Sequence, residues 1–354
     1  MIKIAVTGYY GTGSSAIIDL LSEMDGVKFA LGRRFEHTNL LCRDGLFDLA
    51  TILFSDSTNY HSRDMAINRF KDEMYKQYYN DFGWYGSYKR LIGEPFKSSV
   101  DAFVEAISSE GEKKSLAHTV RVGFSPVKAI LQLGARIILG KKTVKYGRAY
   151  VSDGKTQRFL RVGKEEFDQY ARKFVNDYFE MCAEGDNIMV YDHLILPEQT
   201  AVVDEFFDED FRLIIIDRDP RDVYFSDKFI WNTARHGYQK MPGPRTVEEF
   251  CFHWDEMHKK AQKHSDSRNI MTVRFEDLLY KYDETVKRLC EFCGITSDRH
   301  SAKKQYFDAD KSIKNTQIFK TIKDEHSQKV IEEKLGYLLY DYPYEIQSSE
   351  REIF

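Results

Sequence analysis

The sequence predicts an α/β fold with a central parallel sheet, and two segments far apart in the chain support this prediction. In each segment a short apolar run of β type is followed by a polar turn and then by residues with helical spacing. The apolar runs cover residues 2–6 and 211–216. Apolar runs without alternation are typical of strands buried on both faces, as in a parallel sheet. Each turn therefore follows the carboxyl end of a strand, where such sheets bind ligands.

A glycine-rich turn follows the first apolar run. Gly8, Gly11 and Gly13 permit positive φ and close backbone approach, so that successive amides can face one anion. The helix expected at residues 14–23 adds the positive end of its dipole. The spacing fits a Walker A motif, but Ser14 stands in place of the lysine that P-loop kinases direct at the β- and γ-phosphates. The turn predicts phosphate binding, and the missing lysine argues against ATP chemistry. The alternative is that the glycines are needed only for the backbone conformation of the turn and bind nothing.

The second segment places an arginine directly after the other strand. Asp219 and Pro220 are an N-cap and a first-turn proline, so a helix begins there. Arg218 lies at the strand end and Ser226 lies within the second turn of the helix. A guanidinium and a hydroxyl in these positions can converge on one phosphate. The alternative is that the arginines only pair with neighbouring aspartates, which we expect for Arg221.

These two segments resemble the signatures of the sulfotransferase family, enzymes that move a sulfuryl group from 3′-phosphoadenosine 5′-phosphosulfate (PAPS) to an alcohol or amine. The arginine and serine of the family run R-[ND]-P-[RK]-D-V-x-x-S bind the 3′-phosphate of the donor, and Arg218 and Ser226 match them. The family's first signature, commonly K-S-G-T-T, holds the 5′-phosphosulfate. Its last four positions are matched by Thr12, Gly13, Ser14 and Ser15. Gly11 departs from the pattern, because it falls where the family lysine stands, and the sequence does not show which residue replaces that lysine.

Further stretches extend the resemblance to roughly residues 1–40 and 186–320. Residues 273–279 and 284–294 are similar to the family's strand, E-D-L turn and helix ending at a glycine. The segment with Lys311, Lys314 and Asn315 is weakly similar to the C-terminal basic loop that closes over the nucleotide. The resemblance therefore implies that these three residues bind the donor.

Two residues are candidates for the general base that deprotonates the acceptor. His193 falls in a run similar to the family's strand-end K-T-H-L-P, whose histidine is the base in many members, and Asp192 beside it can orient the ring. The alternative is a histidine with only a structural role. Glu36 is the rival, because carbohydrate sulfotransferases often place a catalytic glutamate in this part of the chain. For Glu36 and for His37 we favour a solvated charged loop.

Composition limits the class of protein. At 354 residues and 42% hydrophobic, the chain can bury a core as one domain, residues 1–354, with an insert at about residues 41–185 that binds the acceptor. A net charge of −4 excludes a generally basic nucleic-acid binder. No apolar run has the length of a membrane span and the first strand starts at once, which predicts a cytoplasmic protein without membrane insertion. Five cysteines suit a reducing compartment, and Cys290 and Cys293 are expected in the core.

The insert combines aromatic and basic stretches. The rings of residues 65–88 either stack on sugars or form the core face of helices, and we favour the core for most of them. Basic residues at 141–161 surround two β-like pieces, 148–151 and 158–161, which we interpret as a solvated surface hairpin. Residues 240–245 are expected to form a mobile loop, and residues 347–354 a frayed end.

Together these observations predict a P-loop NTPase-like, three-layer α/β fold with a mainly helical insert. The predicted activity is transfer of a sulfuryl group from PAPS to a hydroxyl on a glycan or glycan precursor, as in bacterial carbohydrate sulfotransferases. The nucleotide product would be adenosine 3′,5′-bisphosphate (PAP), and no metal is required. One alternative is a P-loop kinase using ATP or GTP, with Asp217 as the candidate Mg²⁺ ligand. Another is a nucleotide-binding regulator without turnover. A homo-oligomer is compatible with the sequence, which does not determine the oligomeric state.

Overall fold

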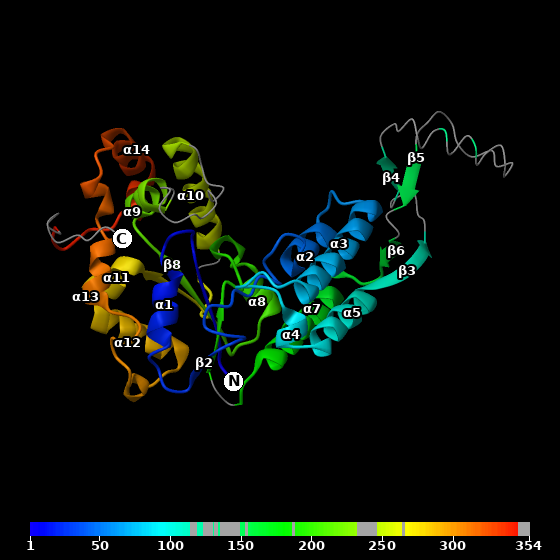
Figure 1. Cartoon of the computed structure of the whole chain (residues 1–354), viewed down its shortest axis with the longest axis horizontal. Coiled ribbons are helices and arrows are strands. Elements are labelled where there is room, and N and C mark those ends of the chain that lie inside the picture. Colours follow the sequence, from blue (N-terminus) through cyan, green and yellow to red (C-terminus); the bar gives the residue numbers. More distant parts are fainter. Residues whose placement is uncertain are drawn as a thin grey trace.

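The computed structural model describes residues 1–113, 119–122, 130, 134, 149–152, 155–185, 188–231, 246–263 and 266–345 (Figure 1). Its central sheet has five parallel strands in the order β2-β7-β1-β8-β9. They span Lys3–Gly8 (β1), Val27–Phe29 (β2), Ile188–Asp192 (β7), Phe211–Asp217 (β8) and Ile270–Arg274 (β9). The predicted α/β fold with a central parallel sheet is confirmed.

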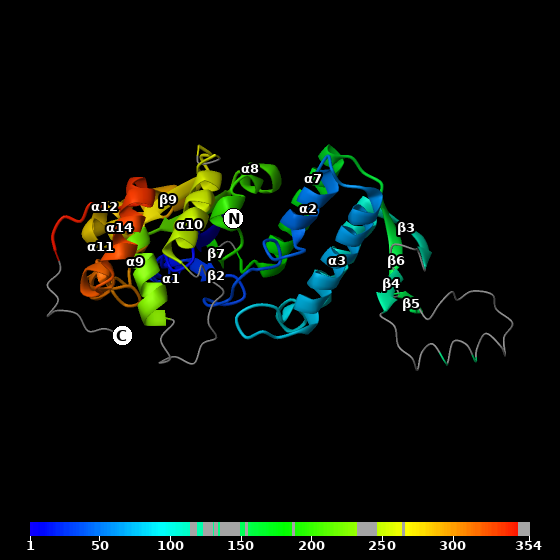
Figure 2. The same cartoon turned by 90° about the horizontal axis from the view of Figure 1, so that it is seen from above.

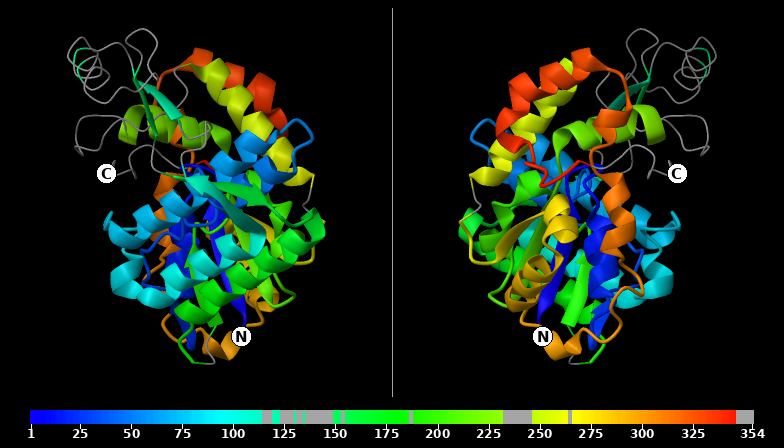
Figure 3. Two further views of the ribbon diagram at one scale, coloured as in Figure 1. Left: turned by 90° about the vertical axis from the view of Figure 1, so that its right-hand side faces the viewer. Right: turned by 90° about the vertical axis from the view of Figure 1, so that its left-hand side faces the viewer.

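Helices cover both faces of this sheet. Alternate residues of its inner strands point to opposite sides, so each face offers apolar residues against which helices pack. Ile4 and Ile214 pack in one apolar cluster, and Ala5 and Leu213 pack in the other. The first cluster includes α1 (Ser14–Leu21), α11 (Phe275–Tyr280) and α12 (Tyr282–Cys293), and the second includes α8 (Val202–Phe206), α10 (Val247–Gln262) and the insert. Figure 3 shows the two sides in turn. Both cysteines of α12 are buried in the first cluster, as predicted.

The insert is a group of packed helices beside the sheet, with short antiparallel strands at its far end (Figure 2). Its helices are α2 (Leu46–Phe54), α3 (Tyr60–Tyr79), α4 (Tyr88–Leu91), α5 (Glu94–Ile107) and α7 (Lys164–Cys182). The eight aromatic rings at residues 65–88 divide between core and surface. Phe70, Tyr78 and Tyr88 are buried, and Tyr75 is partly buried against the same core. Trp84 and Tyr79 are more than half exposed. The expectation that most of these rings are core residues therefore holds for only half of them.

The strands of the insert correct one expectation. β3 (Ser108–Lys113) pairs with β6 (Thr156–Leu160), and β4 (Thr119–Val122) pairs with β5 (Ala149–Ser152). The two basic β-like pieces are therefore strands, but they pair with other segments rather than with each other. Arg158 is buried beside Glu110 instead of solvated. The basic residues at 141–148, the expected loop at 240–245 and the end at 347–354 lie outside the described residues.

Three helices, α9 (Pro220–Phe225), α10 and α14 (Glu325–Leu335), lie near the carboxyl ends of the strands, in the upper part of Figure 1. α9 ends after one and a half turns, and Ser226 begins a π-helical turn instead of continuing the α-helix as expected. π-Helical turns are frequent at functional sites. The remaining elements are η2 (Pro197–Gln199), η3 (Ser226–Trp231), η4 (Ser297–Arg299), α13 (Ala309–Ser312), η5 (Ile313–Asn315), η6 (Ile318–Thr321) and η7 (Gly336–Leu338).

Candidate functional site

The register of the sheet brings the predicted site residues to one edge. Val6 of β1 pairs with Asp192 of β7, and Gly8 pairs with Ile216 of β8. The three strands therefore end side by side. The glycine turn, His193 and Arg218 follow these three ends, although they are far apart in the sequence.

The glycine turn is held closed by its own hydrogen bonds. Gly11 and Gly13 have φ of 75° and 95°, which side chains rarely adopt. The amide and the hydroxyl of Thr12 both donate to the carbonyl of Tyr9, at 3.0 and 2.6 Å. Both donors of Thr12 are therefore engaged within the turn and its side chain is buried, so donor binding by Thr12 stays a prediction that would require these bonds to open. Gly11 and Ser15 are exposed and Ser14 is half-buried, so these residues remain candidates.

Arg218 connects the glycine turn with the C-terminal loop. Its Nη1 donates to the carbonyl of Gly11 at 3.0 Å, and its Nη2 donates to the carbonyl of Asn315 at 2.5 Å. Its guanidinium also lies 5.1 Å from the ring centre of Phe275. The positive charge of Arg218 therefore reaches the carbonyl of the residue that stands where the family has its lysine.

Several buried donors at this edge have no hydrogen-bond partner among the described residues, including Oγ1 of Thr7 and Nε of Arg274. Two more follow the end of β8: Nε of Arg218, which is 8% exposed, and Oγ of Ser226, which is 4% exposed. An unpaired buried polar group costs about 1–3 kcal/mol. A phosphate oxygen would satisfy each of them, so the residue pair fits the 3′-phosphate role that its sequence motif implies.

Asp217 at the end of β8 holds three donors. It accepts the backbone amide of Arg218 at 2.8 Å, Nη1 of Arg274 at 3.0 Å and Nε2 of His258 at 3.2 Å. These contacts use both carboxylate oxygens. The kinase alternative required Asp217 as a Mg²⁺ ligand, and its neutralisation by Arg274 counts against that role.

The next two carboxylates fix the start of α9. Asp219 accepts the amide of Arg221 at 2.9 Å and pairs with its guanidinium at 2.7 Å, which confirms the N-cap and the structural role expected of Arg221. Glu276, from the E-D-L turn, accepts the amide of Asp219 at 2.7 Å. Complete burial raises the pKa of Glu276 to about 7, although the charge of Arg274 opposes this rise.

Asp222 holds the C-terminal loop against this edge. Its carboxylate accepts the amides of Gln317 and Ile318 at 2.7 and 2.6 Å. Burial raises the pKa of Asp222. The loop thereby places the carbonyl of Asn315 on the Arg218 guanidinium.

The two lysines of the same loop point elsewhere in the structure. The side chain of Lys311 is 84% exposed and pairs with Asp308 at 3.3 Å, and Lys314 is also exposed. The described contacts do not bring either amino group to Arg218, so donor binding by Lys311 and Lys314 stays a prediction.

The two candidate bases lie close enough to affect each other's charge. Nδ1 of His193 is 2.8 Å from a carboxylate oxygen of Asp192, as the sequence suggested. Burial lowers the pKa of His193. The hydrogen bond to Asp192 and the charges of Asp192 and Glu36 raise this pKa by more than burial lowers it, so the net change is upward. Burial raises the pKa of Glu36, and the charge of His193 partly offsets this.

These contacts correct the expectations for Glu36 and His37. Glu36 forms a β-bridge with Asp192 and is not part of a solvated loop. His37 is fully buried, and its ring nitrogens lie 2.6 Å from the Tyr178 hydroxyl and 3.1 Å from the Ala30 carbonyl. His37 is therefore a core residue. Sequence reasoning missed the proximity of Glu36 to His193, because it results from strand pairing.

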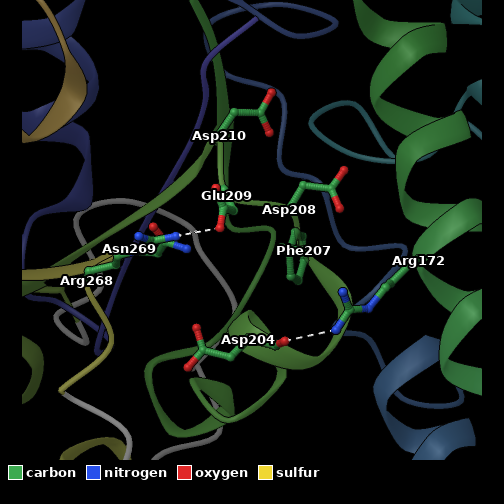
Figure 4. Close-up of a pocket in the computed structure, with 8 residues that line it drawn as sticks. All are labelled: Arg172, Asp204, Phe207, Asp208, Glu209, Asp210, Arg268 and Asn269. Atoms are coloured by element: carbon green, nitrogen blue, oxygen red, sulfur yellow. Dashed lines mark hydrogen bonds and ion pairs between the residues drawn. The ribbon is translucent and has the colours of Figure 1, made fainter. Parts of the chain in front are cut away.

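A separate pocket of about 610 Å³ lies at the amino end of β8 and β9, the edge opposite to the predicted site (Figure 4). Its guanidinium groups are already engaged, Arg172 by the carbonyl of Asp204 and Arg268 by the carboxylate of Glu209. Its lining residues are Arg172, Asp204, Phe207, Asp208, Glu209, Asp210, Arg268 and Asn269. The surplus of carboxylates does not suit an anionic donor.

A comparison with models of protein families covers several residues of this site. The family model described as "Sulfotransferase domain" matches residues 158–336, just over half of the chain. The chain therefore belongs to the sulfotransferase family, whose members are transferases. The match contains Arg218, Ser226 and His193, but it begins inside the predicted insert. No curated protein matches the chain.

Three solved structures resemble the chain in shape, each with 10% sequence identity. The sulfotransferase domain of the Synechococcus PCC 7002 olefin synthase has a TM-score of 0.38, covering 98% of this chain and 90% of its own. The sulfotransferase domain from the curacin biosynthetic pathway has a TM-score of 0.36, covering 98% and 93%. Sulfotransferase STF9 from Mycobacterium avium has a TM-score of 0.35, covering 98% and 77%.

No helix among the described residues is both long and apolar enough to cross a bilayer. The described residues also contain no group of three or more His, Cys, Asp or Glu side chains that could hold a metal ion.

Proposed function

We propose that this protein transfers a sulfuryl group from PAPS to a hydroxyl of a glycan or glycan precursor, in the cytoplasm and without a metal. The observation that carries the proposal is the pair of buried, unpartnered donors on Arg218 and Ser226 beside the glycine turn. A donor with a 3′-phosphate would satisfy both. The exposed backbone at Gly11 and the start of α1 would then face the 5′-phosphosulfate.

The proposed reaction is an in-line displacement at sulfur. The acceptor oxygen forms the new bond to sulfur while the bond from sulfur to the bridging phosphate oxygen breaks, and PAP leaves. The acceptor proton goes to Nε2 of His193. Nδ1 of His193 faces Asp192, so its proton stays there and Nε2 is left as the basic nitrogen. Glu36 is the second candidate for this role.

Positive charge is needed where the leaving phosphate develops its charge. The guanidinium of Arg218 contacts the glycine turn at the position of the family lysine, but its free Nε is assigned to the 3′-phosphate. Lys311 and Lys314 are therefore proposed to supply the positive charge at the leaving phosphate when the donor binds. In this assignment other positive side chains take the place of the family lysine, which is missing at Gly11.

The acceptor class is supported by one exposed tryptophan whose backbone contacts that of a proposed base. The carbonyl of Trp84 accepts the amide of Glu36 at 2.8 Å, and 55% of Trp84 is exposed. The loop that carries Trp84 is closed by Asp81, whose carboxylate accepts the amide of Gly83 at 2.9 Å. A tryptophan on a closed loop can stack on the apolar face of a sugar ring at little entropic cost.

Calorimetry without metal tests the donor site by comparing PAP with ADP and ATP. We expect a strong preference for PAP. A preference for ATP that requires Mg²⁺ would instead favour the kinase reading. Selective PAP binding without transfer to any acceptor would favour a nucleotide-binding regulator.

The acceptor class is tested by comparing saccharides with simple alcohols as substrates. Trp84→Ala should raise the KM for a saccharide acceptor about tenfold and leave PAP affinity unchanged. Tyr79→Ala is the matched control, because Tyr79 is an equally exposed ring of the same insert, at 57%. Equal effects of the two substitutions would contradict the role given to Trp84.

A further inference from the structure

A buried histidine connects the glycine turn with the end of β8. His258 of α10 is 4% exposed, and its ring stacks on Tyr9 with 3.9 Å between ring centres and 11° between planes. Its Nδ1 lies 2.8 Å from the carbonyl of Trp254, and its Nε2 lies 3.2 Å from a carboxylate oxygen of Asp217. Neither the sequence motifs nor the family match gave His258 a role.

The two polar contacts hold the ring in one orientation. Nδ1 of His258 faces the carbonyl of Trp254, one turn earlier in α10. Nε2 faces the carboxylate of Asp217, which also pairs with Arg274 and accepts the amide of Arg218. The ring therefore connects α10 with the end of β8.

The surroundings of the ring keep it in this position. Asp217 contacts one ring nitrogen, and the ring of Tyr9 stacks on the face of the imidazole. The other titratable groups coupled to His258, or to the two residues that it contacts, come from several elements: Asp255 of α10, Arg274 of β9, Glu198 of η2 and Tyr337 of η7.

Tyr9 connects His258 with the candidate site. Tyr9 opens the glycine turn, and its carbonyl receives both donors of Thr12. Asp217 in turn fixes the amide of Arg218. We propose that His258 is a positioning residue, which holds the glycine turn in register with Arg218 through its stack on Tyr9 and its contact to Asp217. This inference rests on the proposed donor site.

The proposal implies that donor affinity depends on both contacts of the ring. The stack on Tyr9 positions the glycine turn, and the contact to Asp217 positions the amide of Arg218. Affinity for PAP should therefore fall when either contact is removed.

Two substitutions separate the ring from its hydrogen bonds. His258→Phe keeps a ring against Tyr9 but donates nothing, and His258→Gln keeps a donor without the ring. The matched control is His300→Gln, because His300 is also buried and pairs with a carboxylate, Glu23, at 2.8 Å. Calorimetry would measure PAP affinity of all four proteins, with folding checked by circular dichroism, and steady-state kinetics would measure the KM for the acceptor.

We expect both His258 variants to bind PAP about tenfold or more weakly than wild type, which corresponds to one lost hydrogen bond to a charged group. The KM for the acceptor should stay at the wild-type value, because the contacts of His258 lie on the donor side of the site. His300→Gln should keep the wild-type affinity for PAP. Folded His258 variants with wild-type affinity, or an equal loss in His300→Gln, would overturn the proposal.

The measurement on wild type separates this proposal from the donor assignment. If wild type binds no PAP, the donor assignment fails. If wild type binds PAP and the folded His258 variants bind it equally well, only the role of His258 fails.

Discussion

Ser226→Ala is the sharpest test of the donor site, because the wild-type hydroxyl makes no hydrogen bond to the described residues. Its Oγ is buried, and Ser226 is 4% exposed. Removing the hydroxyl therefore breaks no hydrogen bond within the described part of the ligand-free protein. It also removes a buried polar group whose burial without a partner costs about 1–3 kcal/mol. We expect the free energy of unfolding to stay equal to wild type or to rise.

The expected loss appears only when a 3′-phosphate is bound. A hydrogen bond to a charged group contributes about 1.5–3 kcal/mol. Ser226→Ala should therefore weaken PAP binding about 10- to 150-fold. Adenosine 5′-monophosphate has no 3′-phosphate, so its affinity should not change.

Isothermal titration calorimetry with both ligands measures this difference, and urea unfolding measures stability. Ser327→Ala is the matched control, since Ser327 is also buried but donates to Asp324 at 2.8 Å. That control should lose stability and keep the wild-type preference for PAP. The reasoning is refuted if Ser226→Ala weakens both ligands equally, or if it destabilises the protein as much as Ser327→Ala does.

Four further outcomes are expected. Arg218→Ala should weaken PAP about 100-fold or more and adenosine 5′-monophosphate less, since it also loses the contacts to the glycine turn and the C-terminal loop; calorimetry would show this, and equal losses would contradict 3′-phosphate binding. His193→Ala should lower the transfer rate about 10²–10⁴-fold and spare PAP affinity, and an unchanged rate would shift the assignment to Glu36. Because His193 acts as a base only when neutral and its pKa is raised, the rate should rise with pH through a value above the ordinary 6.5, and Asp192→Asn should move that rise to lower pH in a pH–rate profile. Gly8→Ala should destabilise the protein by about 1–3 kcal/mol in urea unfolding, since a Cβ there would lie 2.4 Å from the Thr12 hydroxyl and 3.0 Å from a backbone carbonyl.

The local features of the sequence predicted the scaffold well. The apolar run before Arg218 has the composition of a strand buried on both faces, and the structure places it as β8, an inner strand between β1 and β9. Asp219 and Pro220 predicted the start of α9, and Gly294 ends α12 with a φ of 65°. These features depend on neighbours within a few residues, so the sequence alone carries them.

The partners of the site residues could not be predicted in this way. Asp217 was considered as a metal ligand, and its actual partners, Arg274 and His258, lie 57 and 41 residues further along the chain. Glu36 was expected in a solvated loop, yet it bridges to Asp192. Such contacts depend on which strands are neighbours and in which register they pair.

The sequence by itself determined the class of fold, the family resemblance and the residue types available for an anion. Only the tertiary structure decided which of these residues have free donors. Thr12 uses its donors inside the turn, whereas Ser226 has a buried hydroxyl without a partner among the described residues. The physical reason is that hydrogen-bond satisfaction depends on all groups within reach of an atom, and these come from every element packed around it.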